Sequence, residues 1–312
     1  MSRIRLAAAA VCLAALPSDG QESTLRTYVL DPNGRRIEWS SVQTGDSTRS
    51  ETVANLNGAR VPLEEVEEKV LEKEGGRVVI EKTVRRRAPD GRLLPAEKTR
   101  VETLAGEDGT ETQTVIVFRG DLNGALKPAE RSTTRSVKSG GQIQSETLVE
   151  RLSMSGSFAV AERRAATVQA AENKTETNIV VYRPDQNGRM AEAVRQTIRA
   201  EVSNGVTTEQ TDEYENASTG QMRLSRQTLA RTVKNPDGTE RKEVDVFGPA
   251  APGRTANPGD RLALRERQII DRTVSNGQAV ERFSIQRPAL DDDRKLSKPQ
   301  LISETVCQGK CK

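Results

Sequence analysis

Residues 178–188 read Asn-Ile-Val-Val-Tyr-Arg-Pro-Asp-Gln-Asn-Gly, a run of β-branched and aromatic residues followed by a tight turn. The β-branched run is typical of a strand. In the turn, Asp185 stands first, Asn187 third, and Gly188 supplies the left-handed conformation that closes a type I turn into a bulged hairpin. This stretch therefore predicts a strand that ends in a β-hairpin.

The same turn chemistry recurs along the chain and predicts repeated hairpins. The matching residues are Asp31, Asn33 and Gly34; Asp90 and Gly91; Asp121, Asn123 and Gly124; and Asp237 and Gly238.

A second pattern places Pro and then Glu after each turn and advances by about 33 residues, the self-similarity of a repeat array. Its clearest copies are Pro62 and Glu64, Pro95 and Glu97, and Pro128 and Glu130. We therefore expect an all-β fold: an antiparallel β-meander of about eight hairpin repeats with a period of about 32–33 residues.

Charged and polar residues intrude on both faces of the expected strands, whereas a sheet with one dry face alternates cleanly. We therefore expect an extended or rolled sheet with a thin core.

Phe118, Tyr182 and Phe247 precede equivalent turns and are interpreted as repeated core plugs. Recurring arginines favour cross-strand pairing with Glu over a ladder that grips acidic polysaccharide. They are Arg100, Arg131, Arg135, Arg163, Arg199, Arg231 and Arg272.

Residues 63–74 give two conflicting signals. Pro62 at the start, Leu63, Val66 and Val70 on one helical face, and Gly75 at the end are helix signals. The repeat register aligns the same segment with the β-like residues 128–140. We give the register more weight and expect a strand.

The N-terminus has a basic start, an apolar run from Leu6 to Leu16 and small residues at Ser18 and Gly20, which predict a signal peptide over 1–20 with cleavage near Gly20. We expect one β-repeat domain over 21–305, an irregular Pro/Gly-rich loop at 248–260 and a tail at 306–312. No later stretch is apolar enough for a membrane-spanning helix. The expected location is periplasmic or secreted.

Cys307 and Cys311 are the two cysteines that remain after the signal peptide is removed. Export favours a disulfide between them. The alternatives are two free thiols or half of a metal site, for which the chain has no histidine to complete a zinc tetrad.

The absence of histidine removes the common nucleophile and base arrangements. The Asp-x-Asn-Gly turns lack the Glu that a calcium loop needs at its twelfth position, and Asp291, Asp292 and Asp293 are interpreted as a solvated turn. A net charge of only +3 argues against nucleic acid as a partner. We expect no cofactor, no metal and no enzymatic activity.

The resulting hypothesis is an exported, non-enzymatic β-repeat protein with a structural or binding role in the cell envelope or the extracellular space, its partner a polysaccharide or a protein. One alternative is an outer-membrane β-barrel, which needs an apolar outward face and aromatic girdles that the sequence does not display. The other is a carbohydrate-active enzyme that uses two carboxylates.

Overall fold

The computed structural model describes residues 23–30, 36–56, 59–106, 108–121, 125–216, 220–249, 262–275, 278–289 and 295–308. These residues form a single antiparallel sheet of 18 strands. The strands are β1 (Ser23–Leu30), β2 (Arg36–Thr44), β3 (Ser47–Leu56), β4 (Ala59–Glu74), β5 (Arg77–Arg87), β6 (Leu93–Ala105), β7 (Thr110–Gly120), β8 (Leu126–Ser139), β9 (Gln142–Leu152), β10 (Phe158–Ala171), β11 (Lys174–Pro184), β12 (Met190–Ser203), β13 (Val206–Asn216), β14 (Met222–Lys234), β15 (Glu240–Gly248), β16 (Ala263–Ser275), β17 (Gln278–Gln286) and β18 (Gln300–Gln308).

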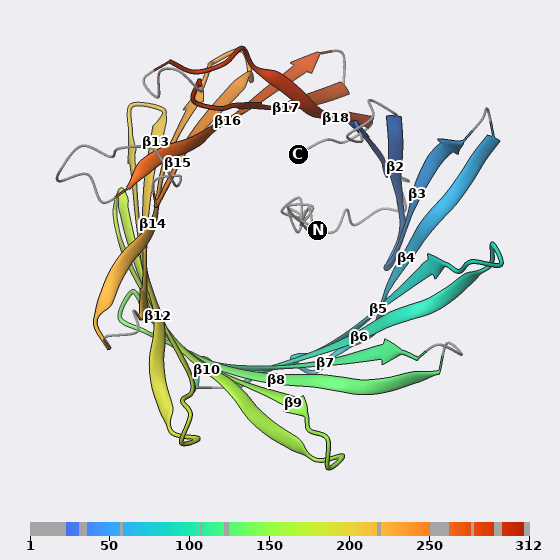
Figure 1. The fold of residues 1–312 in the computed structure, drawn as a ribbon, viewed down its shortest axis with the longest axis vertical. Helices are drawn as coiled ribbons and strands as arrows, with labels where there is room; N and C mark the ends of the chain where they lie inside the picture. The colour runs from blue at the N-terminus through green and yellow to red at the C-terminus, as the bar shows by residue number, and fades with distance from the viewer. Residues whose placement is uncertain are drawn as a thin grey trace.

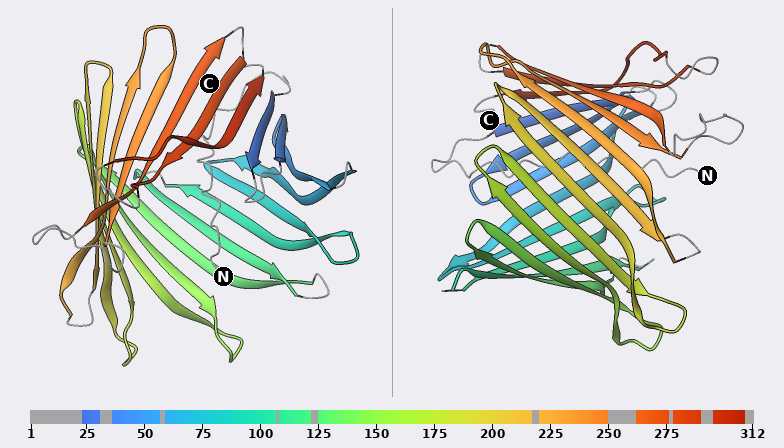
Figure 2. Two further views of the ribbon diagram at one scale, coloured as in Figure 1. Left: turned by 45° about the horizontal axis from the view of Figure 1, so that its top comes forward. Right: turned by 90° about the vertical axis from the view of Figure 1, so that its left-hand side faces the viewer.

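The sheet closes on itself. Every strand pairs with its neighbour in sequence, and β1 pairs with β18 as well as with β2, with Leu25 opposite Cys307 and Thr27 opposite Thr305. Figure 1 shows the ring of strands that results, and Figure 2 shows that the strands cross the wall obliquely, as closure of a barrel requires. The expected all-β antiparallel meander is confirmed, but the expected extended or rolled sheet is wrong, because the wall is a closed barrel.

The disputed segment after Pro62 is a strand. It belongs to β4, which pairs with β3 on one side and β5 on the other. The strands on both sides form hydrogen bonds with the backbone N–H and C=O groups of this segment. This pairing outweighs the helix propensity of its residues. The register-based prediction for residues 63–74 is confirmed.

The two rims of the barrel differ. At one, most strands are joined by two-residue turns such as Gly75–Gly76, Gly140–Gly141 and Asn204–Gly205, the connections at 106–109 and 235–239 being longer, and β1 begins and β18 ends there. We call this the terminus rim. At the opposite loop rim the connections are longer, reaching 249–262 between β15 and β16 and 287–299 between β17 and β18.

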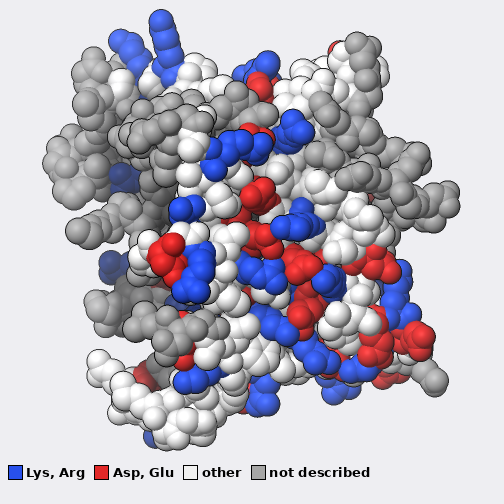
Figure 3. Space-filling view, turned by 90° about the vertical axis from the view of Figure 1, so that its right-hand side faces the viewer, with Lys and Arg blue, Asp and Glu red and all other residues white. Residues whose placement is uncertain are grey.

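Directly paired residues share a face, so the pairing registers divide the wall into two faces around the whole ring. One face contains most of the ion pairs, including Arg49–Glu65 at 2.7 Å and Lys98–Glu81 at 2.7 Å. Figure 3, which views the side of the barrel where β2 to β5 lie, shows acidic and basic side chains interspersed over the outer surface. The ion-paired face is therefore the outward one.

Burial agrees with this assignment. Most of the buried apolar side chains, among them Val84, Val149, Val244 and Val246, lie on the other face, where a concave wall crowds neighbours together; Val53, Val79 and Ile269 are buried on the ion-paired face. Exposed apolar residues such as Leu148 lie on the ion-paired face. The buried core is small, with Ala230, Val244 and Val246 as its cluster, in keeping with the thin core expected from the sequence.

The Pro-x-Glu repeat is a repeated β-bulge. In β4, β6 and β8 the middle residue, Leu63, Ala96 or Ala129, stands outside the pairing. Proline lacks an N–H for the ladder and is tolerated at such places. The extra residue shifts the alternation, so each Pro lies on the outward face and the Glu two positions later lies on the inward face. Later strands keep the bulge without the proline, at Ala161, Ala193, Ser225 and Arg265.

In the described part of the chain, no helix has the length and apolar character to cross a membrane.

Candidate functional site

The bulges build a belt of acidic and basic residues on the inner wall. Arg86 binds Glu64 at 2.9 Å and Arg151 binds Glu130 at 2.9 Å, each from the following strand. In β6 and β7, Glu97 stands directly opposite Arg119. We call these residues and their later counterparts the inner charge belt.

The most enclosed member of the inner charge belt is Glu162 in β10, whose side chain is 7% exposed. Its carboxylate binds the guanidinium of Arg183 at 2.9 Å and also that of Arg164. Two basic partners compensate the burial of one carboxylate, which would otherwise be unfavourable.

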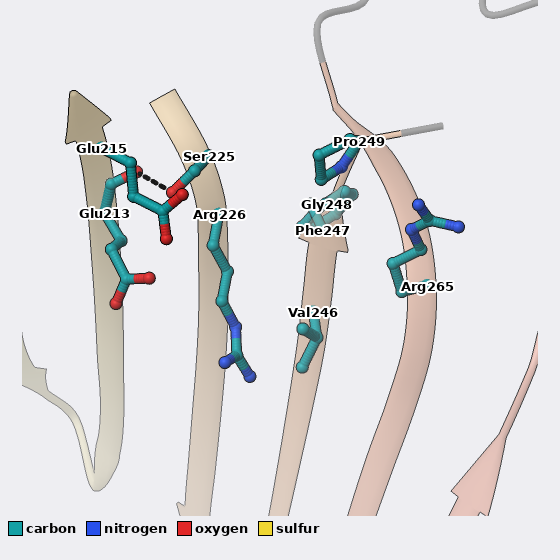
Figure 4. A pocket seen from close by; sticks show the side chains of 9 residues that line it. All are labelled: Glu213, Glu215, Ser225, Arg226, Val246, Phe247, Gly248, Pro249 and Arg265. Atoms are coloured by element: carbon teal, nitrogen blue, oxygen red, sulfur yellow. Dashed lines mark hydrogen bonds between the residues drawn. The ribbon is translucent and has the colours of Figure 1, made fainter. Parts of the chain in front are cut away.

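Between β13 and β16 the inner charge belt borders a hollow of about 440 Å³ that opens towards the loop rim. Figure 4 shows Glu213 and Glu215 on β13, Arg226 on β14 and Arg265 on β16 around it. Glu213 stands opposite Arg226 across the bulge at Ser225, whose hydroxyl donates to the Glu213 carbonyl oxygen at 3.2 Å.

A second hollow of about 220 Å³ adjoins the first and shares Glu213 and Arg226 with it. Gln196, Thr211 and Thr228 complete its lining, and the pairing registers place all of them on the inward face. Within the described ranges, no ion pair holds the side chains of Glu213, Glu215, Arg226 or Arg265. Both charge signs are thus available here to a polar solute in the lumen.

Sequence reasoning missed this hollow. Glu213, Arg226 and Arg265 belong to three strands, and nothing in their local sequence marks them among the many Glu and Arg residues of the chain. The drift from Pro-x-Glu to Leu224-Ser225-Arg226 in the same bulged position is the one signal that could have singled out this sector.

The predicted turn residues lie at the two rims, away from the hollows. At the loop rim, the Asp185 carboxylate accepts hydrogen bonds from the backbone N–H groups of Asn187, at 2.8 Å, and Arg189, at 2.9 Å, and Gly188 has φ +75°. Asp90 with Gly91 and Asp121 are also at the loop rim, and Asp237 with Gly238 is at the terminus rim. The remaining predicted turn residues, Asp31, Asn33, Gly34, Asn123 and Gly124, lie outside the described residues.

The predicted cysteine pair is only partly described. Cys307 belongs to β18 and stands opposite Leu25 and Ala279, so the first residues of the expected tail at 306–312 are part of the barrel wall. Cys311 lies outside the described residues, and the disulfide stays a prediction. The expected signal peptide, most of the 248–260 loop and the Asp291–Asp293 cluster also lie outside them.

Of the seven arginines expected to pair with Glu across strands, Arg131, Arg163 and Arg199 do so. Among the described residues, no ion pair is found for the other four, Arg100, Arg135, Arg231 and Arg272. Arg131 binds Glu150 at 2.7 Å, and Arg163 binds Glu146 at 2.5 Å, both on the outward face. These arginines also lie over aromatic rings: Arg131 is 5.2 Å from the centroid of Phe158, and Arg163 is 5.8 Å from that of Tyr182. The interpretation of Tyr182 and its equivalents as core plugs is wrong, because they lie half-buried on the outer surface.

No protein-family model matches the chain, and no curated protein matches it. Among solved structures, the barrel is similar to two mutant forms of the Rh. blastica porin. The first is 9% identical, with 92% of this chain and 98% of the porin covered and a TM-score of 0.51. The second is 8% identical, with 92% and 99% covered and a TM-score of 0.51. Salmonella typhi OmpF in complex with daunomycin is also similar, at 8% identity and a TM-score of 0.47, with 92% of this chain and 95% of OmpF covered.

The likeness to the Rh. blastica porin defines the class of fold as a porin-like closed β-barrel. It corrects the functional hypothesis drawn from the sequence. The hypothesis of a repeat sheet with free strand faces that acts as a structural or binding module is wrong, because the strands instead form the wall of a barrel.

Proposed function

We propose that this chain is a porin-like β-barrel of the bacterial outer membrane that takes small polar solutes into its lumen. The observation that carries the proposal is the layout of the closed meander: an even number of strands, with short turns and both ends of the sheet at one rim and longer connections at the other. Bacterial outer-membrane barrels share this layout, with the short turns on the periplasmic side.

Two further features support the proposal. The expected signal peptide would deliver the chain across the inner membrane. The inner wall presents carboxylate and guanidinium groups to the lumen, with the unpaired set around Glu213 and Arg226 next to the loop rim. Solutes that enter from the loop rim would meet this hollow first.

The outward wall differs in one respect from the outer-membrane barrels of this layout, which carry a tall apolar band. Here ion pairs such as Arg131–Glu150 and Arg267–Asp245 occupy much of the outer surface. The location of the barrel is therefore the point that an experiment has to test first.

To test this, residues 1–312 are expressed in a Gram-negative host. Soluble, inner-membrane and outer-membrane fractions are then separated before and after an alkaline carbonate wash. We expect the processed chain in the washed outer-membrane fraction. Its single tryptophan, Trp39, faces the lumen, so acrylamide added to those membranes should quench its fluorescence. A chain that appears only in the soluble fraction would contradict the proposal.

A further inference from the structure

The inward side chains become uncharged on the terminus-rim side of the inner charge belt. The residue that follows each bulge belongs to that belt, as Glu97 does in β6 and Glu162 in β10. Four positions further along these strands stand Val101 and Ala166, each directly opposite an inward residue of the next strand. In every hairpin from β6–β7 to β16–β17 both residues of this pair are uncharged. We call these pairs the inner apolar band.

The inner apolar band consists of aliphatic, aromatic and threonine side chains. Val101 stands opposite Val115, Ala166 opposite Ile179, and Ile270 opposite Phe283. In the β8–β9 hairpin the pair is Thr134 and Thr147, whose hydroxyls are 2.8 Å apart and hydrogen-bond to each other. The band therefore presents mainly hydrocarbon to the lumen.

The outward side of the same strands is charged at this height. Arg199, the sequence neighbour of the band residue Ile198, is 3.6 Å from Asp212, and Arg241 is 3.4 Å from Asp271. Outer-membrane barrels have the reverse arrangement, an apolar band outside and a polar interior. In this part of the wall the more apolar face is thus the one that lines the lumen.

A wall of aliphatic side chains that faces water is unfavourable, and a large apolar surface of this kind marks a binding site. The concave interior of a barrel can enclose a ligand. A hydrocarbon chain that lies against the inner apolar band would remove both apolar surfaces from water. Each methylene group buried in this way tightens binding by up to about fourfold.

The two hollows connect the inner apolar band to charged groups near the loop rim. Thr211, which pairs with Ile198 in the band, also lines the smaller hollow. Val246 lines the larger hollow and is buried in one cluster with the band pair Ala230 and Val244. A chain on the band can therefore carry a polar head that lies in the hollows.

The charges around the larger hollow are divided by sign between strands. Figure 4 shows the carboxylates of Glu213 and Glu215 on β13 and the guanidinium groups of Arg226 and Arg265 on β14 and β16. The carboxylates suit a cationic group, and the guanidinium groups suit a phosphate. A head that carries one cation and one anion is complementary to both sides.

We propose that the lumen binds a single-chain lipid with a zwitterionic head. The head lies in the hollow between β13 and β16, and the acyl chain lies along the inner apolar band towards the terminus rim. This inference rests on the proposed entry of solutes from the loop rim and names their class: a polar head that carries a hydrocarbon chain. It does not depend on where the barrel is located in the cell.

The first test is calorimetric titration of the purified mature barrel with lauroyl-lysophosphatidylethanolamine, its hexanoyl analogue and glycerophosphoethanolamine, which is the head alone. We expect the lauroyl lipid to bind about 100-fold or more tighter than the hexanoyl lipid. Glu213→Val with Arg226→Glu installs the residues that Val117 and Glu130 provide at the equivalent pair of β7 and β8. This double variant should weaken binding of the lauroyl lipid about tenfold.

The matched control makes the same change of charge on the outward face. Glu201→Val with Lys174→Glu alters an exposed pair 3.5 Å apart. We expect this variant to bind the lauroyl lipid as the unaltered barrel does. Equal weakening by the two double variants would overturn the hollow as the site of the head.

The second test locates the acyl chain by fluorescence quenching. In a chain with Trp39→Phe, Ile198→Trp places a tryptophan in the inner apolar band, and Thr197→Trp places one on the outward face one position away. Thr134→Trp and Thr133→Trp repeat the comparison in β8 in case one variant does not fold. A brominated acyl chain on the same lipid should quench the inward tryptophans much more strongly than the outward ones.

The remaining outcomes separate this inference from the proposed function. Equal affinity for the head alone and for the lauroyl lipid would overturn the chain site and leave the entry of polar solutes intact. Outward quenching as strong as inward quenching would overturn the lumen as the place where the chain lies. Failure to bind any of the three compounds would overturn the inference together with the proposed entry of solutes, while the fractionation decides the membrane location separately.

Discussion

The hydroxyl of Thr27 in β1 donates a hydrogen bond to the hydroxyl of Thr305 in β18 at 3.1 Å, across 278 positions of sequence. The two residues stand opposite each other in the pairing register, on the inward face. This contact lies on the seam where the meander becomes a barrel. An open sheet would leave the backbone groups at the edges of β1 and β18 unpaired, whereas here the two strands pair with each other.

Loss of the β1–β18 pairing should destabilise the fold much more than loss of the hydrogen bond between Thr27 and Thr305. Deletion of residues 300–312 exposes the edges of β1 and β17, and we expect association or misfolding of the product. Thr27→Val removes one hydrogen bond and should lower the free energy of unfolding by about 1 kcal/mol. Size-exclusion chromatography and urea unfolding measure the two effects, and a monomeric, fully stable deletion product would contradict the closed wall.

The bulges set which side chains enter the lumen. Deletion of Ala129 removes one bulge, so the outward Pro128 and the inward Glu130 could no longer both keep their faces. We expect the deletion to lower the urea midpoint far more than Ala129→Ser, which keeps the residue count. Equal midpoints for the two variants would contradict the role of the bulge.

Glu162 should be the most sensitive carboxylate of the inner charge belt, because it is enclosed by Arg164 and Arg183. Glu162→Gln leaves both guanidinium groups without an anionic partner and should lower the free energy of unfolding by about 1–3 kcal/mol. The matched control is Glu201→Gln, which breaks an exposed pair with Lys174 at 3.5 Å and should cost under about 0.5 kcal/mol. Urea unfolding compares them, and equal losses would contradict the enclosure of Glu162.

The turn at Asp237 should weaken in acid. The hydroxyl and N–H of Thr239 donate to the Asp237 carboxylate at 2.6 and 2.9 Å and hold the pKa of this carboxyl below its usual value. A lowered folded-state pKa means that the contribution is present above the unfolded pKa, near 3.8, and is lost as pH falls through the folded one. Amide protection of Thr239 should fall over that window, and in Asp237→Asn it should not change with pH there.

The local sequence predicted the strands well. Turn residues such as Asp185 and Gly188 place hairpin ends within a few positions, and the Pro62 and Glu64 pattern gives the period that the bulges follow. Even the helix-like composition of residues 63–74 was outweighed by the repeat register. These features depend on residues close together in the chain, where turn chemistry and alternation act.

Closure could not be predicted in the same way. The pairing of Thr27 with Thr305 joins the two ends of the sheet, and no local pattern distinguishes an edge strand that meets its partner from one that stays open. The outward position of the aromatic side chains was missed for a related reason. Phe118, Tyr182 and Phe247 are far apart in sequence and lie in one band only because the bulges and the closed register place them on one face at one height.

The central claim, that this chain forms a closed barrel, is tested most directly by disulfide trapping across the seam. In a chain with Cys307→Ser and Cys311→Ser, Thr27→Cys with Thr305→Cys spans β1 and β18. The matched control, Thr134→Cys with Thr147→Cys, spans the β8–β9 hairpin, where the two hydroxyls are 2.8 Å apart. After mild oxidation and proteolysis, the closed barrel predicts a cross-linked peptide from both pairs. A cross-link from the hairpin pair alone would show that the sheet is open.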